Sequence, residues 1–208
     1  MKLAIFGGTG RTGQYLIKAA LEKGYSVSAL ARDPSKLSSA PNLTVVQGDV
    51  KDPVCVQQVI SGAQAVLSVL GPTSNQPLFE ISLGTANILA AMQQANVRRL
   101  VLTAGAGVGD PNDTPKLFNH VMNGLLKLAA KNVLADMQKV VGMVRASDRD
   151  WTVVRLPMLT DNPPTGKVQV GYVGKGMRSR IARADIAGFL LSQVEDSTYL
   201  RKSPAISN

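Results

Sequence analysis

Glycines near the start of the chain stand at a spacing that suits the binding of phosphate groups. Residues 8–13 read Gly-Thr-Gly-Arg-Thr-Gly, which fits the pattern G-x-G-x-x-G. The apolar run 3–6 precedes this turn, and an amphipathic, helix-like stretch over 13–23 follows it. Glycine lets backbone N–H groups approach a phosphate without a Cβ in the way, and a helix N-terminus attracts anions. The context predicts a dinucleotide site whose pyrophosphate lies at this turn, rather than a glycine-rich turn without a ligand.

The end of the second apolar run, residues 26–31, bears on the choice between NAD and NADP. An acidic residue there would bind the ribose hydroxyls of NAD, but the chain has Arg32. A guanidinium can pair with a 2′-phosphate, and Lys36 and Arg11 could add positive charge. Asp33 is expected to cap the turn beside Pro34. We therefore expect NADPH/NADP rather than NAD, the alternative being that Arg32 is a solvated turn residue.

Two further strand ends carry candidates for contacts with the dinucleotide. Asp49 follows the apolar run 43–47 and could reach an adenine amino group, or it could be an ordinary turn aspartate. Gly71 and Pro72 follow the run 65–70, where a backbone passes close to a nicotinamide ribose in such folds, or they form a plain turn. Both alternatives stay open for each position.

Catalytic groups are scarce in this chain. None of the four tyrosines is followed by a lysine four residues on, so the Tyr/Lys acid pair of the usual short-chain dehydrogenases is absent. The candidates are Thr103, at the tip of an apolar run, and His120, the one histidine. The alternative for Thr103 is β-branched packing within a strand. The alternative for His120 is a surface or half-buried place on a helix. The sequence shows no metal-ligand cluster, no Ser/His/Asp arrangement and no P-loop lysine, so no catalytic residue is assigned.

The elements that must position these residues alternate as strands and helices, which indicates a parallel sheet with helices on both faces. We expect one Rossmann-like, doubly wound α/β domain over 1–208, with a small C-terminal substrate lobe and a substrate-side loop or extra strand near 158–183. A helix over 118–144 should break near Lys131 and Asn132. Strands are predicted at 3–6, 26–31, 43–47, 65–70, 100–103, 152–155 and 168–173, and further helices at 13–23, 53–60, 81–94 and 184–194.

The composition indicates which kind of partner the protein binds and in which compartment it is expected. The 208 residues are 45% hydrophobic and carry a net charge of +9, but the basic residues are scattered, which favours an anionic small molecule over nucleic acid. No apolar run approaches the roughly 20 residues of a membrane span. The single cysteine, Cys55, cannot form an internal disulfide and is expected to pack as a small hydrophobe. We expect a cytoplasmic protein with no membrane contact, and a monomer by default.

Six stretches together resemble the atypical short-chain dehydrogenase/reductase superfamily. The similarity is to its NAD(P)H-binding branch, which includes flavin reductase/biliverdin-IXβ reductase and the NmrA-like proteins. The resemblance implies a Rossmann fold and the binding of NAD(P)H across nearly the whole chain. The matching stretches are residues 5–13, 31–37, 48–50, 69–71, 151–157 and 181–187.

The resemblance also implies roles for particular residues. It places the pyrophosphate at the glycine turn, the 2′-phosphate at a basic clamp, the adenine at the third strand end, and the nicotinamide at the fourth. The residues implied, in that order, are Gly7, Thr9, Gly10, Arg11, Thr12 and Gly13; Arg32 and Lys36; Asp49 and Val50; and Leu70 and Gly71.

The substrate pocket departs from the pattern of the relatives. Gly105 stands where a serine is expected, Thr73 is nearest to an expected arginine, and Met158 follows Pro157 where a histidine is expected. With Pro72, these residues would form a more apolar pocket. We therefore expect an NADPH-dependent reductase of flavins or a related planar acceptor, such as a tetrapyrrole or quinone, in which solvent can supply the proton. The alternative is a non-catalytic NmrA-like redox sensor; a sugar-nucleotide epimerase or dehydratase is disfavoured, since it needs the missing tyrosine.

Overall fold

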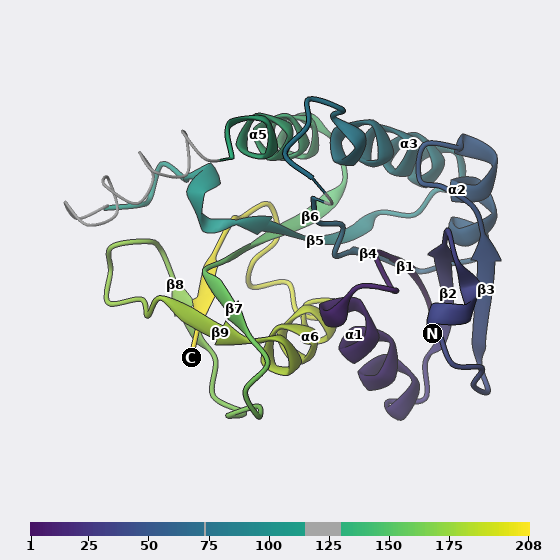
Figure 1. Ribbon diagram of the computed structural model, residues 1–208, viewed down its shortest axis with the longest axis horizontal. Coiled ribbons are helices and arrows are strands. Elements are labelled where there is room, and N and C mark those ends of the chain that lie inside the picture. The colour runs from purple at the N-terminus through teal and green to yellow at the C-terminus, as the bar shows by residue number, and fades with distance from the viewer. Residues whose placement is uncertain (73, 115–129) are drawn as a thin grey trace.

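The computed structural model describes residues 1–72, 74–114 and 130–208 and contains one large, mostly parallel sheet (Figure 1). Its strand order is β3-β2-β1-β4-β5-β6-β10-β8, so the chain reverses direction across the sheet between β1 and β4. Among the strand pairs that the described residues form in this sheet, only β10–β8 is antiparallel. The doubly wound Rossmann-like sheet predicted from the sequence is confirmed. Its strands are β1 (Lys2–Phe6), β2 (Ser26–Ala31), β3 (Leu43–Gln47), β4 (Ala65–Ser68), β5 (Arg99–Gly105), β6 (Asp150–Leu156), β8 (Gln169–Gly171) and β10 (Ala205–Ser207).

Helices cover both faces of this sheet (Figure 1). On one face α1 (Arg11–Glu22) packs against α6 (Arg183–Ser192), and their apolar side chains join those of β1, β2 and β4 in one buried cluster. On the other face lie α2 (Pro53–Ile60), α3 (Glu80–Gln94) and α5 (Lys131–Ala146), with a second buried cluster beneath them. Each face of the central strands is thus removed from water, which explains why these strands read as apolar runs.

The C-terminal part contains elements that the sequence did not predict. A two-stranded parallel sheet joins β7 (Met158–Thr160) to β9 (Arg180–Ala182), and β10 adds to the main sheet beside β6. The predicted extra strand at 168–173 is confirmed in shorter form as β8. The second piece of the helix predicted at 118–144 is confirmed as α5, whereas its first piece falls on residues 115–129, outside the described part of the chain.

A buried ion pair ties the C-terminal elements together. Arg155 of β6 is fully buried and donates from Nη1 to Oδ2 of Asp113 (2.6 Å), from Nη2 to Oδ1 (2.8 Å), and from Nε to the Ser203 carbonyl (2.8 Å). Asp113 also accepts from the backbone N–H groups of Asp110 (2.8 Å) and Val173 (2.9 Å). One carboxylate therefore links the loop after β5 to β6 and to the segment after β8.

No helix among the described residues is long and apolar enough to cross a membrane. The same residues hold no group of three or more His, Cys, Asp or Glu side chains placed to bind a metal ion.

Candidate functional site

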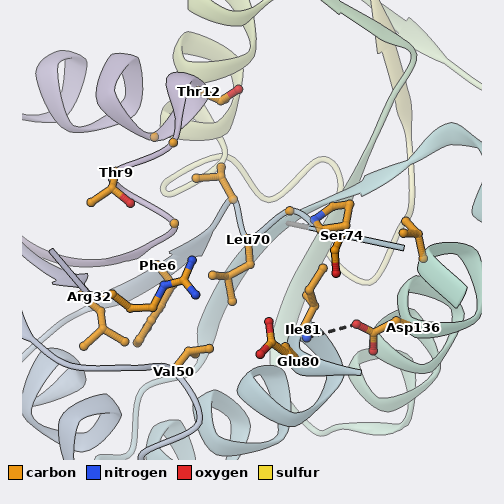
Figure 2. Close-up of a pocket in the computed structure, with 18 of the residues that line it drawn as sticks. Phe6, Thr9, Thr12, Arg32, Val50, Leu70, Ser74, Glu80, Ile81 and Asp136 are labelled. Atoms are coloured by element: carbon orange, nitrogen blue, oxygen red, sulfur yellow. Dashed lines mark hydrogen bonds between the residues drawn. The ribbon is translucent and has the colours of Figure 1, made fainter. Parts of the chain in front are cut away.

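A cavity of about 480 Å³ opens where β1, β2, β3 and β4 end (Figure 2). This is the switch point of the sheet, where ligands of open α/β folds bind. In Figure 2, Arg32, Thr9 and Val50 lie on one side of it, and Ser74 and Asp136 on the other. Residues that line it are Phe6, Gly7, Thr9, Gly10, Arg11, Thr12, Gly13, Leu30, Arg32, Gly48, Asp49, Val50, Val69, Leu70, Gly71, Pro72, Ser74, Gln76, Leu78, Phe79, Glu80, Ile81, Asn132, Val133, Asp136, Leu159 and Arg183.

The glycine turn between β1 and α1 is too tight for side chains at two positions. Gly7 has φ +82°, and a Cβ there would lie 2.7 Å from the Val69 carbonyl oxygen. A Cβ on Gly13 would lie 2.1 Å from the Gly7 carbonyl oxygen, which also accepts the N–H of Gly10 at 3.1 Å. The turn thereby brings the first turn of α1 against the cavity, and N–H groups of a first turn lack intrahelical acceptors. This cradle fits a pyrophosphate group.

Arg32 faces the cavity at the end of β2, and its side chain is exposed (Figure 2). No hydrogen bond or ion pair ties its guanidinium to another of the described residues. The expected role of Asp33 as a turn cap is confirmed, since it accepts from Ser35 N (3.1 Å) and Ser35 Oγ (2.6 Å), and these bonds lower the pKa of its carboxyl. Lys36 lies elsewhere: it lines a second cavity, of about 350 Å³, between α1 and the segment 36–43.

In the loop after β3, Asp49 makes the hydrogen bond expected of a turn aspartate and also faces the cavity, where the adenine contact stays a prediction. Oδ1 of Asp49 accepts the Lys51 N–H (2.9 Å), as in a turn, while Asp49 also lines the cavity. Lys51 Nζ reaches Oε1 of Glu80 (3.0 Å) at the start of α3, and this hydrogen bond raises the pKa of Lys51. Val50 packs on Gly84 of α3, where a Cβ would lie 2.6 Å from a Val50 methyl carbon. The loop and α3 thus form one wall.

The wall opposite the glycine turn comes from α5 and the start of α3. Asp136 of α5 is 6% exposed and accepts the N–H groups of Ile81 (3.1 Å) and Ser82 (3.0 Å), which caps α3 from another helix (Figure 2). Before it, Phe79 adopts φ +48°, a strained value for a bulky residue, and Lys139 Nζ lies 3.8 Å from its ring centroid. The sequence reasoning missed this wall, and the spacing of Asn132 and Asp136, one helical turn apart, is the one signal that could have indicated it.

The residues predicted for the substrate pocket do not all meet in this cavity. Pro72 lines it, but Gly105, Pro157 and Met158 do not, and Met158 on β7 is 60% exposed. Thr103 is buried in β5, where it pairs in register with Val154 of β6, and it does not line the cavity.

Two of the predicted residues, Thr73 and His120, lie outside the described residues. Their assigned roles stay predictions.

Two arginines at the rim of the cavity share one carboxylate, which the sequence did not indicate. Arg11 Nη1 lies 2.7 Å from Oδ2 of Asp161, and Arg183 Nη1 lies 2.6 Å from its Oδ1. Arg11 and Arg183 are the first residues of α1 and α6, and Asp161 follows β7. These contacts join segments 150 and 22 residues apart, so no local pattern predicts them.

Comparison with known proteins gives consistent matches. The model of a family described as NAD(P)H-binding matches residues 7–197. An uncharacterized chloroplastic protein of Arabidopsis thaliana is 29% identical over 94% of this chain and 74% of its own length, and cinnamoyl-CoA reductase 1 of Petunia hybrida is 31% identical over 55% and 38% respectively. A short-chain dehydrogenase/reductase of Veillonella parvula, solved in complex with NADP, superposes with a TM-score of 0.83 at 17% identity, over 100% of this chain and 94% of its own.

Proposed function

Because the chain belongs to the NAD(P)H-binding family of the atypical short-chain dehydrogenase/reductase superfamily, we propose that it is an NADPH-dependent reductase of a planar acceptor. The acceptor class is a flavin or a related molecule such as a tetrapyrrole or quinone. One observation carries the proposal: a single cavity joins the glycine turn and the Arg32 guanidinium to a wall that carries several apolar side chains. Such a cavity offers room for the cofactor's phosphates at one end and for a flat apolar molecule at the other.

The residues present fit the cofactor. Gly7 and Gly13 let the turn close tightly before α1, so that its N–H groups could face a pyrophosphate, and Arg32 would pair with the 2′-phosphate. Asp49 and Val50 would border the adenine, and Gly71 the nicotinamide side. Bound NADPH would supply a hydride to the acceptor, and water at the open end of the cavity would supply the proton.

The apolar side chains of this wall favour a planar acceptor over a sugar or a small alcohol. Beyond Gly71 the apolar lining residues are Pro72, Leu78, Phe79, Ile81, Val133 and Leu159, and they alternate with the polar residues Ser74, Gln76, Glu80, Asn132, Asp136 and Arg183. Burying the faces of a flat ring system against the apolar side chains is favourable, at about 25 cal/mol per Å² of apolar surface. Orientation of the acceptor over the nicotinamide would then account for most of the rate enhancement.

The test is a panel of acceptors given to the purified protein with NADPH. We expect loss of NADPH absorbance with FMN, riboflavin, a linear tetrapyrrole or a quinone, and a product spectrum of the reduced acceptor. Tight binding of NADPH without turnover of any member of the panel would contradict a reductase.

Tight binding of NADPH without turnover is the behaviour expected of the alternative function, a non-catalytic redox sensor that regulates a partner. The absence of the Tyr/Lys pair from the sequence favours it. A sensor of this kind is recognised by its affinities: tight binding of both NADPH and NADP⁺, a conformational difference between the two complexes, and no reductase activity.

Replacement of Arg32 by alanine tests the preference for NADPH. The change is expected to weaken NADPH binding by about 1–3 kcal/mol, the range for losing a charged hydrogen-bond partner, and to leave NADH binding within about twofold. Calorimetric titration of both nucleotides measures the two effects, and Lys36→Ala is the matched control, since Lys36 lies in the second cavity. Equal losses for NADPH and NADH would show that Arg32 does not bind the 2′-phosphate.

A further inference from the structure

The Arg11–Asp161–Arg183 bridge lies at the end of the cavity where the glycine turn meets α1. Arg11 and Arg183 both line the cavity, whereas Asp161 stands behind them on the loop after β7. The Arg183 side chain is 10% exposed, so its charge is largely withdrawn from water and needs an anionic partner. The Arg11 side chain is 70% exposed, so it can turn either toward Asp161 or toward the cavity.

The loop that carries Asp161 is fastened at its far end. Asp185, buried in the first turn of α6, accepts the N–H groups of Thr165 (2.8 Å) and Gly166 (3.0 Å). At its near end, β7 pairs with β9. Two proline residues, at 163 and 164, stiffen the span between these anchors. The carboxylate is therefore held at the rim by covalent and backbone constraints, rather than only by the two arginines.

A phosphate group and a carboxylate use the same N–H donors of a guanidinium. An anion bound at the first turn of α1 would lie beside Arg11, the first residue of that helix. The fixed negative charge of Asp161 would then both occupy Arg11 and repel the incoming phosphate.

We propose that Asp161 is an internal competitor of the dinucleotide's pyrophosphate: it holds Arg11 until phosphate displaces it, and it keeps Arg183 paired throughout. The inference rests on the proposed cofactor site and adds a residue that sets its affinity. Asp161 would thereby weaken binding of NADPH and NADP⁺ alike, which favours release of the spent nucleotide.

Asp161→Asn tests this inference by affinity, without any assay of turnover. The variant keeps a side chain of the same size but removes the competing charge, so we expect NADPH and inorganic pyrophosphate each to bind about three- to tenfold more tightly. The gain should shrink as salt is raised, because the interaction is partly exposed to solvent. Glu22→Gln is the matched control, since it removes one exposed negative charge from the same helix as Arg11 and should leave both affinities within about twofold.

A double-mutant cycle with Arg11→Gln identifies the group for which Asp161 competes. If the inference is right, the tightening caused by Asp161→Asn is largely lost in the Arg11→Gln background. Unchanged or weaker binding of both probes by the Asp161→Asn protein would overturn the inference, and weaker binding would show that Asp161 positions the arginines for phosphate. Failure of the unchanged protein to bind NADPH or NADH would overturn the cofactor site instead, and the pyrophosphate titrations would still decide the role of Asp161.

Discussion

Replacement of Asp113 by alanine is expected to lower the free energy of unfolding by about 3–5 kcal/mol, the usual cost of leaving one member of a buried ion pair alone. The variant leaves the guanidinium of Arg155, which is 0% exposed, without the two oxygens of the Asp113 carboxylate that accept its hydrogen bonds. It also removes the acceptor of the Asp110 and Val173 N–H groups. Urea unfolding followed by circular dichroism measures the change.

Glu22→Ala is the control, since its carboxylate is 65% exposed and its removal should change the unfolding free energy by less than about 0.5 kcal/mol. A loss below about 1 kcal/mol for Asp113→Ala would mean that Arg155 finds other acceptors. The variant with both residues made apolar, Asp113→Leu with Arg155→Met, should recover part of the stability, because it leaves no unpaired buried charge.

The same pair predicts a pH dependence. Burial by itself raises the pKa of Asp113, but the hydrogen bonds and charge of Arg155 outweigh it, so the net pKa lies below its ordinary value. A carboxyl with a lowered pKa in the folded state stabilises the protein above its unfolded pKa of about 3.9, and this stability is lost as pH falls through the folded pKa. The difference between the unchanged protein and Asp113→Ala should thus be constant near neutral pH and narrow below about pH 4.

The central fold could be predicted because its signals are local. β1 to β6 are apolar runs bounded by glycine, proline or polar turns, and their alternation with helices implies a parallel sheet. β7, β9 and β10 have three residues each, too few to show a period of two, and they exist because distant segments pair with them. Strand ends were also misplaced: β5 runs on to Gly105, which the sequence reasoning left outside its strand.

The residues of the candidate site likewise fall into those that local sequence signals predict and those that depend on distant contacts. Residues within three positions of a strand end, such as Gly7, Arg32, Asp49 and Gly71, could be predicted because the strand ends of a Rossmann sheet converge. The opposite wall was missed because it depends on a contact between α5 and α3, in which Asp136 accepts an N–H 55 residues away. Apart from Asn132, one helical turn before it, nothing near Asp136 in the sequence distinguishes it from a surface aspartate of an amphipathic helix.

Replacement of Gly13 by alanine is expected to abolish binding of NADPH, with a loss of affinity above about 100-fold, or more than about 2.7 kcal/mol. The added Cβ would lie 2.1 Å from the Gly7 carbonyl oxygen and 2.7 Å from the Gly8 Cα, so the turn and the start of α1 must move apart. Both contacts are to backbone, which cannot rotate away as a side chain would. The displaced turn would no longer present its N–H groups to a pyrophosphate.

Gly142→Ala is the matched control for the same change of residue. Gly142 also lies within a helix, but a Cβ there would meet nothing within 4 Å, so alanine should stabilise α5 by about 0.5–1 kcal/mol and leave NADPH binding unaltered. Calorimetric titration gives the affinities, and thermal unfolding shows whether the Gly13→Ala protein remains folded at the temperature of the titration. If it is folded and binds NADPH within tenfold of the unchanged protein, the pyrophosphate does not lie at this turn. If it binds neither NADPH nor inorganic pyrophosphate while the Gly142→Ala protein binds both, the close approach of Gly13 to Gly7 is what forms the phosphate site.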